Sequence, residues 1–277
     1  MQNQSFFTRK FVPTAQSLQV LMKGMVINMA EQLRLDKYLA DMGIGTRSEI
    51  KEWIRKGRVM LNDTICTRPE SKVLVESDIV RFDTALVGYV KNQYIMLYKP
   101  AGVVSATHDN VSKTVLELIT DQKCKDLFPV GRLDKDTEGL LLITNDGELA
   151  HQLLSPKKHV DKVYFARVRG RVTEEDRLCF LHGVDIKEEE LTMPAYLTIL
   201  SSGEISEVEL TLHEGKFHQV KRMFEAVGKE VIYLKRLSMG SLILDPDLKP
   251  GEYRELTDQE LAGLRNKGSY WDKGLSD

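Results

Sequence analysis

The sequence predicts an α+β fold, in which a small helical unit precedes a larger domain built on a mixed, largely antiparallel sheet. Apolar residues between positions 33 and 57 recur at the i, i+3, i+4, i+7 spacing of amphipathic helices. From Tyr94 onward, strand-like runs are joined mostly by glycine or polar turns rather than by helical crossovers. At 277 residues and 42% hydrophobic content, the chain can bury one sizeable core and one smaller core.

The small unit begins with a helix whose apolar residues share one face: Leu35, Tyr38, Leu39 and Met42. Two glycines end this helix. Thr46 and Glu49 then form a capping box for a second helix, which stops at Gly57. Short strands are expected at 59–61 and 64–67, and the residues between them form the turn.

A stripe of cations lies on the second helix. Arg47, Lys51 and Arg55 recur every four residues, and Arg58 extends the stripe just past the helix end. Cations at this spacing can follow a phosphate backbone, which favours RNA binding. The same spacing also fits an ordinary solvated face. The pattern alone leaves both interpretations open.

In the larger domain the strand-like runs are long and regular. We expect strands at 94–98, 140–144, 162–169, 195–200, 205–212 and 231–237. The domain contains neither a G-x-G-x-x-G segment nor a Walker-type loop, and its histidines show no metal-ligand spacing. We therefore expect no cofactor and no metal.

The composition limits the classes of function. A formal net charge of −2 excludes a uniformly basic nucleic-acid binder, so any RNA contact must use local patches. No run of about 18 apolar residues is present to span a bilayer. Cys66, Cys124 and Cys179 lie too far apart for a C-x-x-C pair. We expect a cytoplasmic protein with reduced thiols and no membrane partner.

The organisation of the chain follows from these patterns. Residues 1–30 have three basic groups, no acid and no clear period, and they lack the features of a signal peptide. We expect a disordered extension there, or an upstream start codon with Met29 as the working one. The predicted segments are the extension at 1–30, the small unit at 31–83, a linker at 84–93, the larger domain at 94–265 and a tail at 266–277.

One carboxylate is a candidate nucleophile. Asp134 lies in the glycine-bounded segment G-R-L-D-K-D-T-E-G, residues 131–139, which leads directly into a buried strand. A glycosidase needs two carboxylates roughly 5 to 10 Å apart on opposite faces of a sugar. Asp136 and Glu138 share one short loop with Asp134, and such a loop seldom straddles a substrate. By pattern alone, a solvated acidic loop is the default for all three.

Four segments resemble motifs of the RNA pseudouridine synthases, specifically the RsuA-like branch that modifies ribosomal RNA. The segment from Gly131 matches the signature G-R-L-D-x-x-T-x-G-L-L, and the segment E-G-K-F-H-Q-V-K-R-M, residues 214–223, is similar to the third motif. The K-V-Y at 162–164 is similar to the K-x-Y segment, and the K-P-A-G at 99–102 to the K-P-x-G motif. Residues 31–83 look like an S4 domain, an RNA-binding module. The resemblance covers about residues 33–262.

The resemblance implies roles for the residues at the matching positions. It implies that Asp134 is the catalytic nucleophile and that Tyr164 stacks on the uracil and takes the C5 proton. A basic residue after the His-Gln pair is expected to face the nucleophile. By position this is Lys221, with Arg222 as the alternative. Lys99 is expected to support the catalytic loop and to lie near phosphate.

The target base has to leave its stack before it reaches the carboxylate. Arg132, beside the nucleophile, is a candidate to fill the vacated space or to hold a phosphate. The densest basic stretch of the domain is the candidate RNA track, with Arg222 as a further RNA contact. The stretch contains Lys157, Lys158, Lys162, Arg167, Arg169 and Arg171. Strand alternation is expected to place its arginines on one face.

The resemblance implies site-specific isomerisation of a uridine to pseudouridine in ribosomal RNA, most consistent with one uridine of 16S small-subunit rRNA. The segments at 155–159 and 250–254 favour the small-subunit branch. The alternatives are an enzyme for a large-subunit (23S) hairpin and a non-catalytic rRNA-binding assembly factor. The expected partner is rRNA, free or in a partly assembled small subunit, and no DNA. We expect the protein to act as a monomer.

Overall fold

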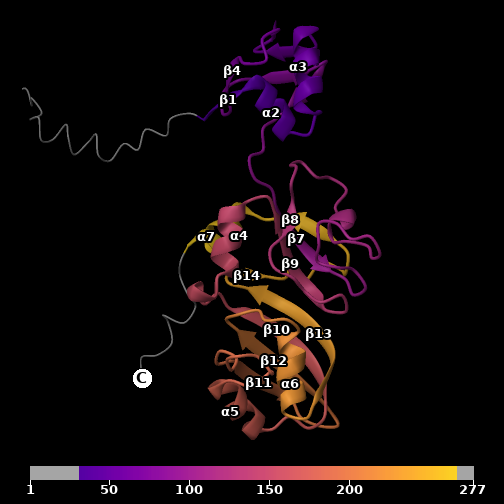
Figure 1. Cartoon of the computed structure of the whole chain (residues 1–277), viewed down its shortest axis with the longest axis vertical. Helices are drawn as coiled ribbons and strands as arrows, with labels where there is room; N and C mark the ends of the chain where they lie inside the picture. Colours follow the sequence, from indigo (N-terminus) through magenta and orange to yellow (C-terminus); the bar gives the residue numbers. More distant parts are fainter. Residues whose placement is uncertain (1–30, 267–277) are drawn as a thin grey trace, which may run out of the picture. The chain divides into compact units, whose positions relative to one another are not determined.

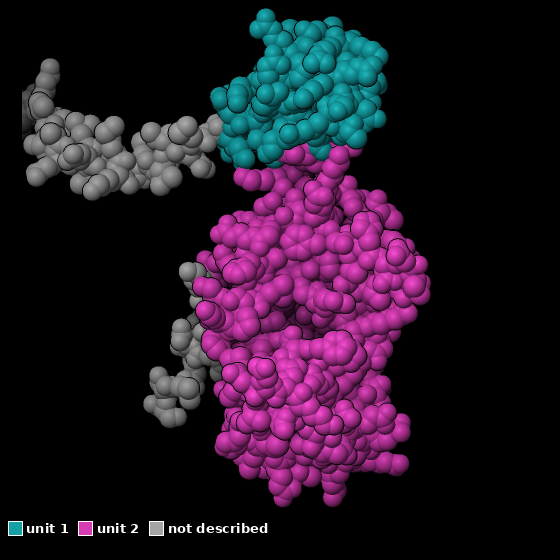
Figure 2. Space-filling view, viewed as in Figure 1, with its two compact units in different colours: residues 1–40, 45–89 teal, residues 41–44, 90–277 magenta. Residues whose placement is uncertain are grey.

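The computed structural model describes residues 31–266, which form two compact units (Figures 1 and 2). Among the described residues, unit 1 extends to Tyr89 apart from 41–44, and unit 2 contains 41–44 and the chain from Val90 onward. The expected extension at 1–30 and nearly all of the expected tail lie outside the described residues.

Unit 1 combines two helices with short strands, and its core is formed by apolar residues from both. The helices are α2 (Leu35–Asp41) and α3 (Arg47–Arg55). The strands are β1 (Gln32–Arg34), β2 (Val59–Leu61), β3 (Thr64–Ile65), β4 (Lys72–Leu74), β5 (Val80–Phe82) and β6 (Ala85–Val87). The predicted capping box at Thr46 is present, since the Thr46 hydroxyl accepts from the Glu49 amide and the Glu49 carboxylate accepts from the Thr46 amide. Asn62 and Asp63 both have positive φ, as a two-residue hairpin turn requires.

The linker predicted at 84–93 is wrong in its first half. Residues 85–87 form β6, which pairs with β5 in a four-stranded sheet of order β3-β2-β5-β6. The chain reverses at Asp83, whose φ is 54°. The absence of charge in this stretch therefore reflects a strand that is paired on one side rather than a connection between domains.

Unit 2 is built around one mixed sheet in which the only parallel pair of named strands, within residues 90–266, joins β9 and β13. The order of the main strands is β11-β12-β10-β13-β9-β7-β15, with β8 paired to β9 and β14 to β13. The strands are β7 (Tyr94–Lys99), β8 (Phe128–Pro129), β9 (Glu138–Thr144), β10 (Lys162–Arg169), β11 (Tyr196–Ser201), β12 (Ile205–Leu212), β13 (Glu230–Met239), β14 (Leu242–Ile243) and β15 (Tyr253–Glu255). The helices are η1 (Leu116–Leu118), α4 (Gly147–Leu154), η2 (Pro156–Lys158), α5 (Glu174–His182), α6 (Gln219–Ala226) and α7 (Asp258–Arg265).

The sheet of unit 2 has a hydrophobic core on each face. Successive residues of β7 alternate between them, so Leu97 belongs to one core and Met96 to the other. The first core receives Phe180 from α5 and Phe224 from α6, whose rings meet edge to face. The second is covered by α4 and α7 (Figure 1). The predicted α+β class and the largely antiparallel sheet are confirmed, and no helix among the described residues is long and apolar enough to cross a membrane.

Candidate active site

The loop that carries Asp134 connects β8 to β9 and is fixed by close backbone packing at its end. Gly139 has a φ of 104°, and it pairs in parallel with Arg236 of β13. A Cβ atom at position 139 would lie 2.3 Å from the carbonyl oxygen of Arg236. Only glycine fits here, because any side chain would force β9 and β13 apart. The conformation of the loop therefore depends on the second glycine of the signature.

The K-P-A-G segment, residues 99–102, holds the same loop through hydrogen bonds to its backbone carbonyls. The buried Lys99 ammonium donates hydrogen bonds to the carbonyl oxygens of Thr137 at 2.7 Å, Pro100 at 3.0 Å and Lys135 at 3.3 Å. The amide of Gly102 donates to Lys135 as well. The prediction that Lys99 lies near phosphate is wrong, because three protein carbonyls occupy its donors and none of its side chain reaches solvent.

Ser105, three residues after this segment, fixes the loop just before Asp134. The Ser105 hydroxyl donates to the carbonyl oxygen of Leu133 at 2.9 Å and accepts from the Leu133 amide at 3.1 Å. Ser105 and Leu133 are both buried. Bonds to both backbone groups of one residue set its orientation, so the neighbouring Asp134 projects from a rigid support.

The buried Lys99 makes stability depend on pH. Burial lowers the pKa of Lys99 to about 8, although Asp136, Asp134 and Glu138 raise it. Between pH 8 and the ordinary lysine pKa of 10.5, the unfolded chain binds a proton that the folded chain has released. The free energy of unfolding therefore rises with pH in this window. Below the window, burying the charged Lys99 ammonium group destabilises the folded chain most.

Urea unfolding of the wild type and of Lys99→Met should show the wild type gaining roughly 2 kcal/mol relative to the variant between pH 7 and pH 10. An equal difference in stability between the two proteins at both pH values would contradict a lowered pKa of Lys99.

Helix α6 brings two basic side chains to Asp134. Lys221 Nζ lies 3.3 Å from Asp134 Oδ2 and 2.6 Å from Asp136 Oδ1. His218, at the N-cap of α6, places Nε2 3.5 Å from Asp134 Oδ1. His218 and Lys221 are three residues apart, which places them on the same side of the first helical turn. Asp134 thus lies between a lysine and a histidine.

The charges of this cluster support one another. Burial raises the pKa of Asp136, but the hydrogen bond and charge of Lys221 outweigh this effect and hold it below the usual aspartate range. Burial also lowers the pKa of Lys221, and the opposing effect of Asp136 and Asp134 leaves it raised. At neutral pH Asp136 is therefore a carboxylate that faces an ammonium group.

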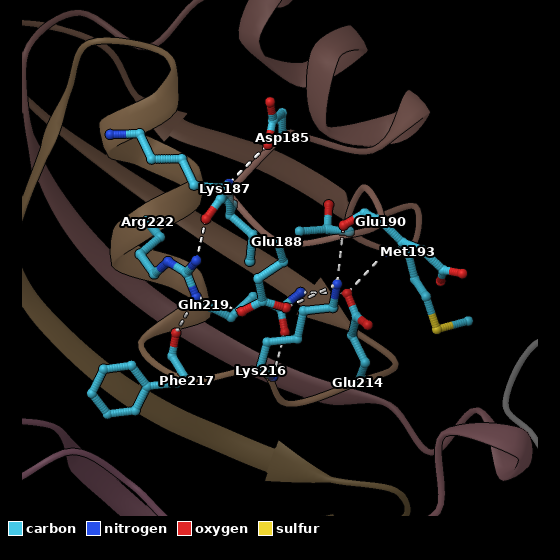
Figure 3. Close-up of polar contacts among 12 residues, drawn as sticks. Asp185, Lys187, Glu188, Glu190, Met193, Glu214, Lys216, Phe217, Gln219 and Arg222 are labelled. Carbon is cyan, nitrogen blue, oxygen red and sulfur yellow. Dashed lines mark hydrogen bonds and ion pairs between the residues drawn. The ribbon is translucent and has the colours of Figure 1, made fainter.

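The third motif forms a closed loop of polar contacts before α6 (Figure 3). The buried Glu214 carboxylate accepts from Gln219 Nε2 at 2.7 Å and from the amide of Met193 at 2.8 Å. Gln219 Oε1 in turn accepts from the Lys216 amide. These bonds use the Glu and the Gln of the motif to fix the entry into α6, and hence the direction of Lys221.

Arg222 faces away from Asp134. Its guanidinium donates to Glu188 Oε1 at 2.6 Å and to the carbonyl oxygens of Ile186 and Phe217 (Figure 3). Lys221, not Arg222, is therefore the basic residue at Asp134. A carboxylate and two carbonyl groups accept hydrogen bonds from Arg222, and its assignment to RNA stays a prediction.

A cleft opens beside Asp134. It is lined by residues of four segments: Arg132, Leu133, Asp134, Thr137, Tyr164, Leu212, Gly215, Lys216, His218, Gln219, Val220 and Leu234. Tyr164 of β10 is nearly buried and belongs to the adjacent hydrophobic core, so its ring forms part of an apolar floor with Leu212 and Leu234. The exposed Arg132 and His218 form the mouth. The cleft therefore combines an apolar floor, one carboxylate and a basic rim.

Known proteins match both units. A family model described as RNA pseudouridylate synthase matches residues 93–226, and an S4 domain model matches residues 33–80. An uncharacterized RNA pseudouridine synthase from Bacillus subtilis is 47% identical over 231 residues, which make up 83% of this chain and 97% of that protein. The chain belongs to the RNA pseudouridine synthase family. It is an enzyme that isomerises uridine to pseudouridine in RNA.

Other relatives of the synthase cover the same range. The ribosomal small subunit pseudouridine synthase A of Vibrio cholerae is 40% identical over 84% of this chain and 99% of that protein. The protein of that name from Escherichia coli is 38% identical over 84% and 100%, respectively. A crystal structure of a pseudouridylate synthase, 37% identical, covers 84% of this chain and 99% of that chain, with a TM-score of 0.59. The predicted resemblance to the RsuA-like branch is confirmed.

The predicted RNA track of the synthase is only partly on the surface. Lys162 is buried and donates to the Val160 carbonyl, and burial lowers its pKa to about 8. Its assignment to RNA is therefore wrong, because in β10 even-numbered residues face the core. Arg167 lies on the opposite, exposed face, where it pairs with Glu207 of β12. Lys157 and Lys158 are exposed on η2.

The cationic stripe of the S4 domain is shorter than predicted. Arg58 forms two hydrogen bonds with Asp83, at 2.8 and 2.6 Å, and packs over the rings of Trp53 and Phe82. This ion pair largely neutralises Arg58, so it does not extend the stripe as a free cation. The remaining members, Arg47, Lys51 and Arg55, have no ion-pair partner among the residues that the structure describes.

The sequence predicts no role beside Asp134 for two of its neighbours. Asp136, which is expected to be a solvated acidic residue, shares Lys221 with Asp134. His218 is expected only as a member of the third motif. A signal for His218 was available, because it stands three residues before Lys221 at the start of a predicted helix, and this spacing places both on one side. No comparable signal existed for Asp136, whose partner lies 85 residues away in the sequence.

Proposed function

We propose that this synthase converts one uridine of small-subunit ribosomal RNA to pseudouridine, with Asp134 as the nucleophile. The observation that carries the proposal is the position of Asp134, on a rigid loop at the edge of an apolar cleft and in contact with Lys221 and His218. A neighbouring ammonium group favours the ionised form of a carboxyl group, which is the form that acts as a nucleophile. The choice of RNA rests on the relatives that are named for the ribosomal small subunit.

The reaction asks for one nucleophile and one proton transfer. The bond between N1 of the uracil and C1′ of the ribose breaks, the base turns, and a bond forms between C5 and C1′ while the C5 proton leaves. Asp134 can begin it by adding to C6, by adding at C1′, or by removing a ribose proton to give a glycal. Each route needs the ionised carboxylate next to the base, and none needs an oxidant or a hydrolytic water.

The cleft supplies the other contacts. In the proposed complex, Tyr164 stacks on the uracil and its hydroxyl relays the C5 proton to solvent. Leu212 and Leu234 exclude water from the same floor. The cleft has a volume of about 60 Å³. In the proposed complex the exposed Arg132 moves aside as the flipped base enters, and it then contacts phosphate or fills the vacated stack.

The S4 domain adds affinity in this proposal. Arg47, Lys51 and Arg55 project from one face of α3, and none of them forms an ion pair within residues 31–266, although the Asp36 charge acts on Lys51. In the proposed complex they contact successive phosphates. Phosphate contacts position an RNA without reading its sequence, so the choice of uridine is left to unit 2.

Mapping pseudouridine in ribosomal RNA tests the proposal. RNA from a strain that lacks the protein should lose one carbodiimide-dependent primer-extension stop in small-subunit rRNA, and expression of the wild-type chain should restore it. Expression of the Asp134→Asn chain should not restore it. Identical maps with and without the protein would overturn the function. A single loss in large-subunit rRNA would overturn the choice of RNA while retaining the reaction.

A further inference from the structure

A large aromatic ring is exposed beside the active site. Phe217 is 74% exposed, and its ring stacks on His218 with centroids 3.8 Å apart and planes inclined by 19°. Aromatic side chains normally bury most of their surface, since exposing it to water is unfavourable. The imidazole covers one face of Phe217, which leaves the other face available. Such an arrangement offers a flat apolar platform to solvent.

The platform is rigid. The Phe217 carbonyl accepts from Arg222 Nη1 at 3.1 Å, and the preceding residue, Lys216, is held through its amide by Gln219. His218 adopts a φ of 49°, the left-handed conformation that turns the chain into α6. Figure 3 shows the Phe217 ring pointing away from the polar contacts that hold its backbone. A ring on a fixed backbone loses little conformational entropy when a ligand stacks on it.

The platform adjoins the reacting groups but does not line the cleft. His218 contributes its imidazole to the cleft and lies 3.5 Å from Asp134, whereas Phe217 is absent from the lining. Arg132, across the mouth, has no hydrogen-bond or ion-pair partner among residues 31–266. A ligand that reaches from the cleft across its rim would therefore meet an aromatic face, with an unpaired cation nearby.

We propose that the Phe217–His218 pair is a stacking subsite for the nucleobase adjacent to the target uridine. The inference rests on the proposed function, in which a uridine is flipped out of an RNA. Flipping leaves the neighbouring base without one of its stacking partners. Phe217 replaces that partner, which lowers the cost of flipping. Stacking needs one ring face and tolerates any base, whereas a protein partner needs a larger contiguous apolar patch.

The test compares side chains at position 217 on an rRNA fragment that the wild-type enzyme modifies. Stacking of a base on an aromatic ring contributes about 1–3 kcal/mol, so Phe217→Leu, which keeps an apolar side chain without a ring, should lower kcat/KM by about 10-fold or more. Phe217→Trp keeps a ring and should remain within about 3-fold of the wild type. Equal thermal unfolding midpoints establish that the variants fold.

Substrates with an abasic nucleotide on either side of the target uridine identify the contact. With one of these substrates, the wild type should be slowed about as much as Phe217→Leu slows the reaction on the intact fragment. The Phe217→Leu variant should be slowed little further by the same abasic nucleotide, because both changes remove the same stacking contact. Multiplicative effects for both abasic substrates would overturn the subsite. So would full activity of Phe217→Leu on the naked fragment with a loss confined to ribosomal particles, which indicates a protein partner. Identical pseudouridine maps of ribosomal RNA with and without the protein would refute the proposed function instead.

Discussion

Asp134→Asn should lower the rate of pseudouridine formation by about 10⁴-fold or more while RNA affinity stays within about 2-fold of the wild type. Asparagine keeps the size of the side chain and can still accept a hydrogen bond from Lys221, so the loop held by Lys99 and Ser105 should not change. It carries no charge and is no nucleophile. Release of tritium from C5-labelled uridine in rRNA measures the reaction, because the C5 proton leaves in every route.

Asp136→Asn is the matched control for this prediction. Asp136 lies two residues away, accepts from the same Lys221, and has a side chain that is 72% exposed. Its substitution should cost at most about 10-fold, because the contact between Lys221 and Asp134 remains. If Asp136→Asn eliminates tritium release and Asp134→Asn does not, Asp136 is the nucleophile and the assignment to Asp134 is wrong.

A second control should weaken RNA binding while the rate of the chemical step stays unchanged. Replacement of Arg47, Lys51 and Arg55 together by glutamine should weaken RNA binding and flatten its dependence on salt, since each lost phosphate contact lowers the slope by about one. The rate at saturating RNA should remain that of the wild type, because α3 of the S4 domain contributes no residue to the cleft.

Lys221→Met should reduce kcat/KM by about 10²- to 10³-fold, the usual effect of removing one preorganised charged donor from an active site. Lys221 is the ammonium group in contact with both Asp134 and Asp136. Without it, two carboxylates on one short loop repel each other and bind a proton more readily. Lys221→Arg keeps the charge and should retain more of the activity, although its planar fork does not fit the same point contact.

The pH dependence of Lys221→Met distinguishes charge from positioning. Lys221 holds the pKa of Asp136 below the usual range, so its loss raises that pKa. The titration of the Asp136 carboxyl, followed by NMR, should therefore move to higher pH in Lys221→Met and only slightly in Lys221→Arg. An unshifted titration of Asp136 at reduced kcat/KM would indicate that Lys221 acts by positioning alone.

Much of the fold could be predicted because its signals are local. Polar and apolar residues alternate at 166–169 and 207–212, within the strands predicted at 162–169 and 205–212, and both strands are found with these bounds as β10 and β12. Helix α3 begins where the capping box of Thr46 and Glu49 places it. The error at β6 has a nonlocal cause, because residues 85–87 become a strand by pairing with β5, and their own sequence carries no alternation strong enough to reveal it.

In the candidate site, too, short motifs located some residues, and contacts between distant segments decided the roles of others. The signature segment located Asp134, and the third motif narrowed the facing cation to two adjacent residues. Only the structure identifies Lys221 as the residue that faces Asp134. Arg222 binds Glu188 instead, in a loop more than 30 residues away in the sequence. Tyr164 was located by its motif, and its place in the floor of the cleft follows from the pairing of β10 between β12 and β13.

By itself, the sequence determined the class of this protein, because strand alternation, helix caps and short catalytic segments are all written over a few consecutive residues. The tertiary structure alone decided what each charge does. The sequence assigns Lys99 and Lys162 to RNA contacts, yet distant carbonyl acceptors or core packing bury them. Asp136 and His218 gain their roles from neighbours that the folded chain brings together. The effect of a charged group depends on its partners and its access to water, and both are set by contacts between residues far apart in the chain.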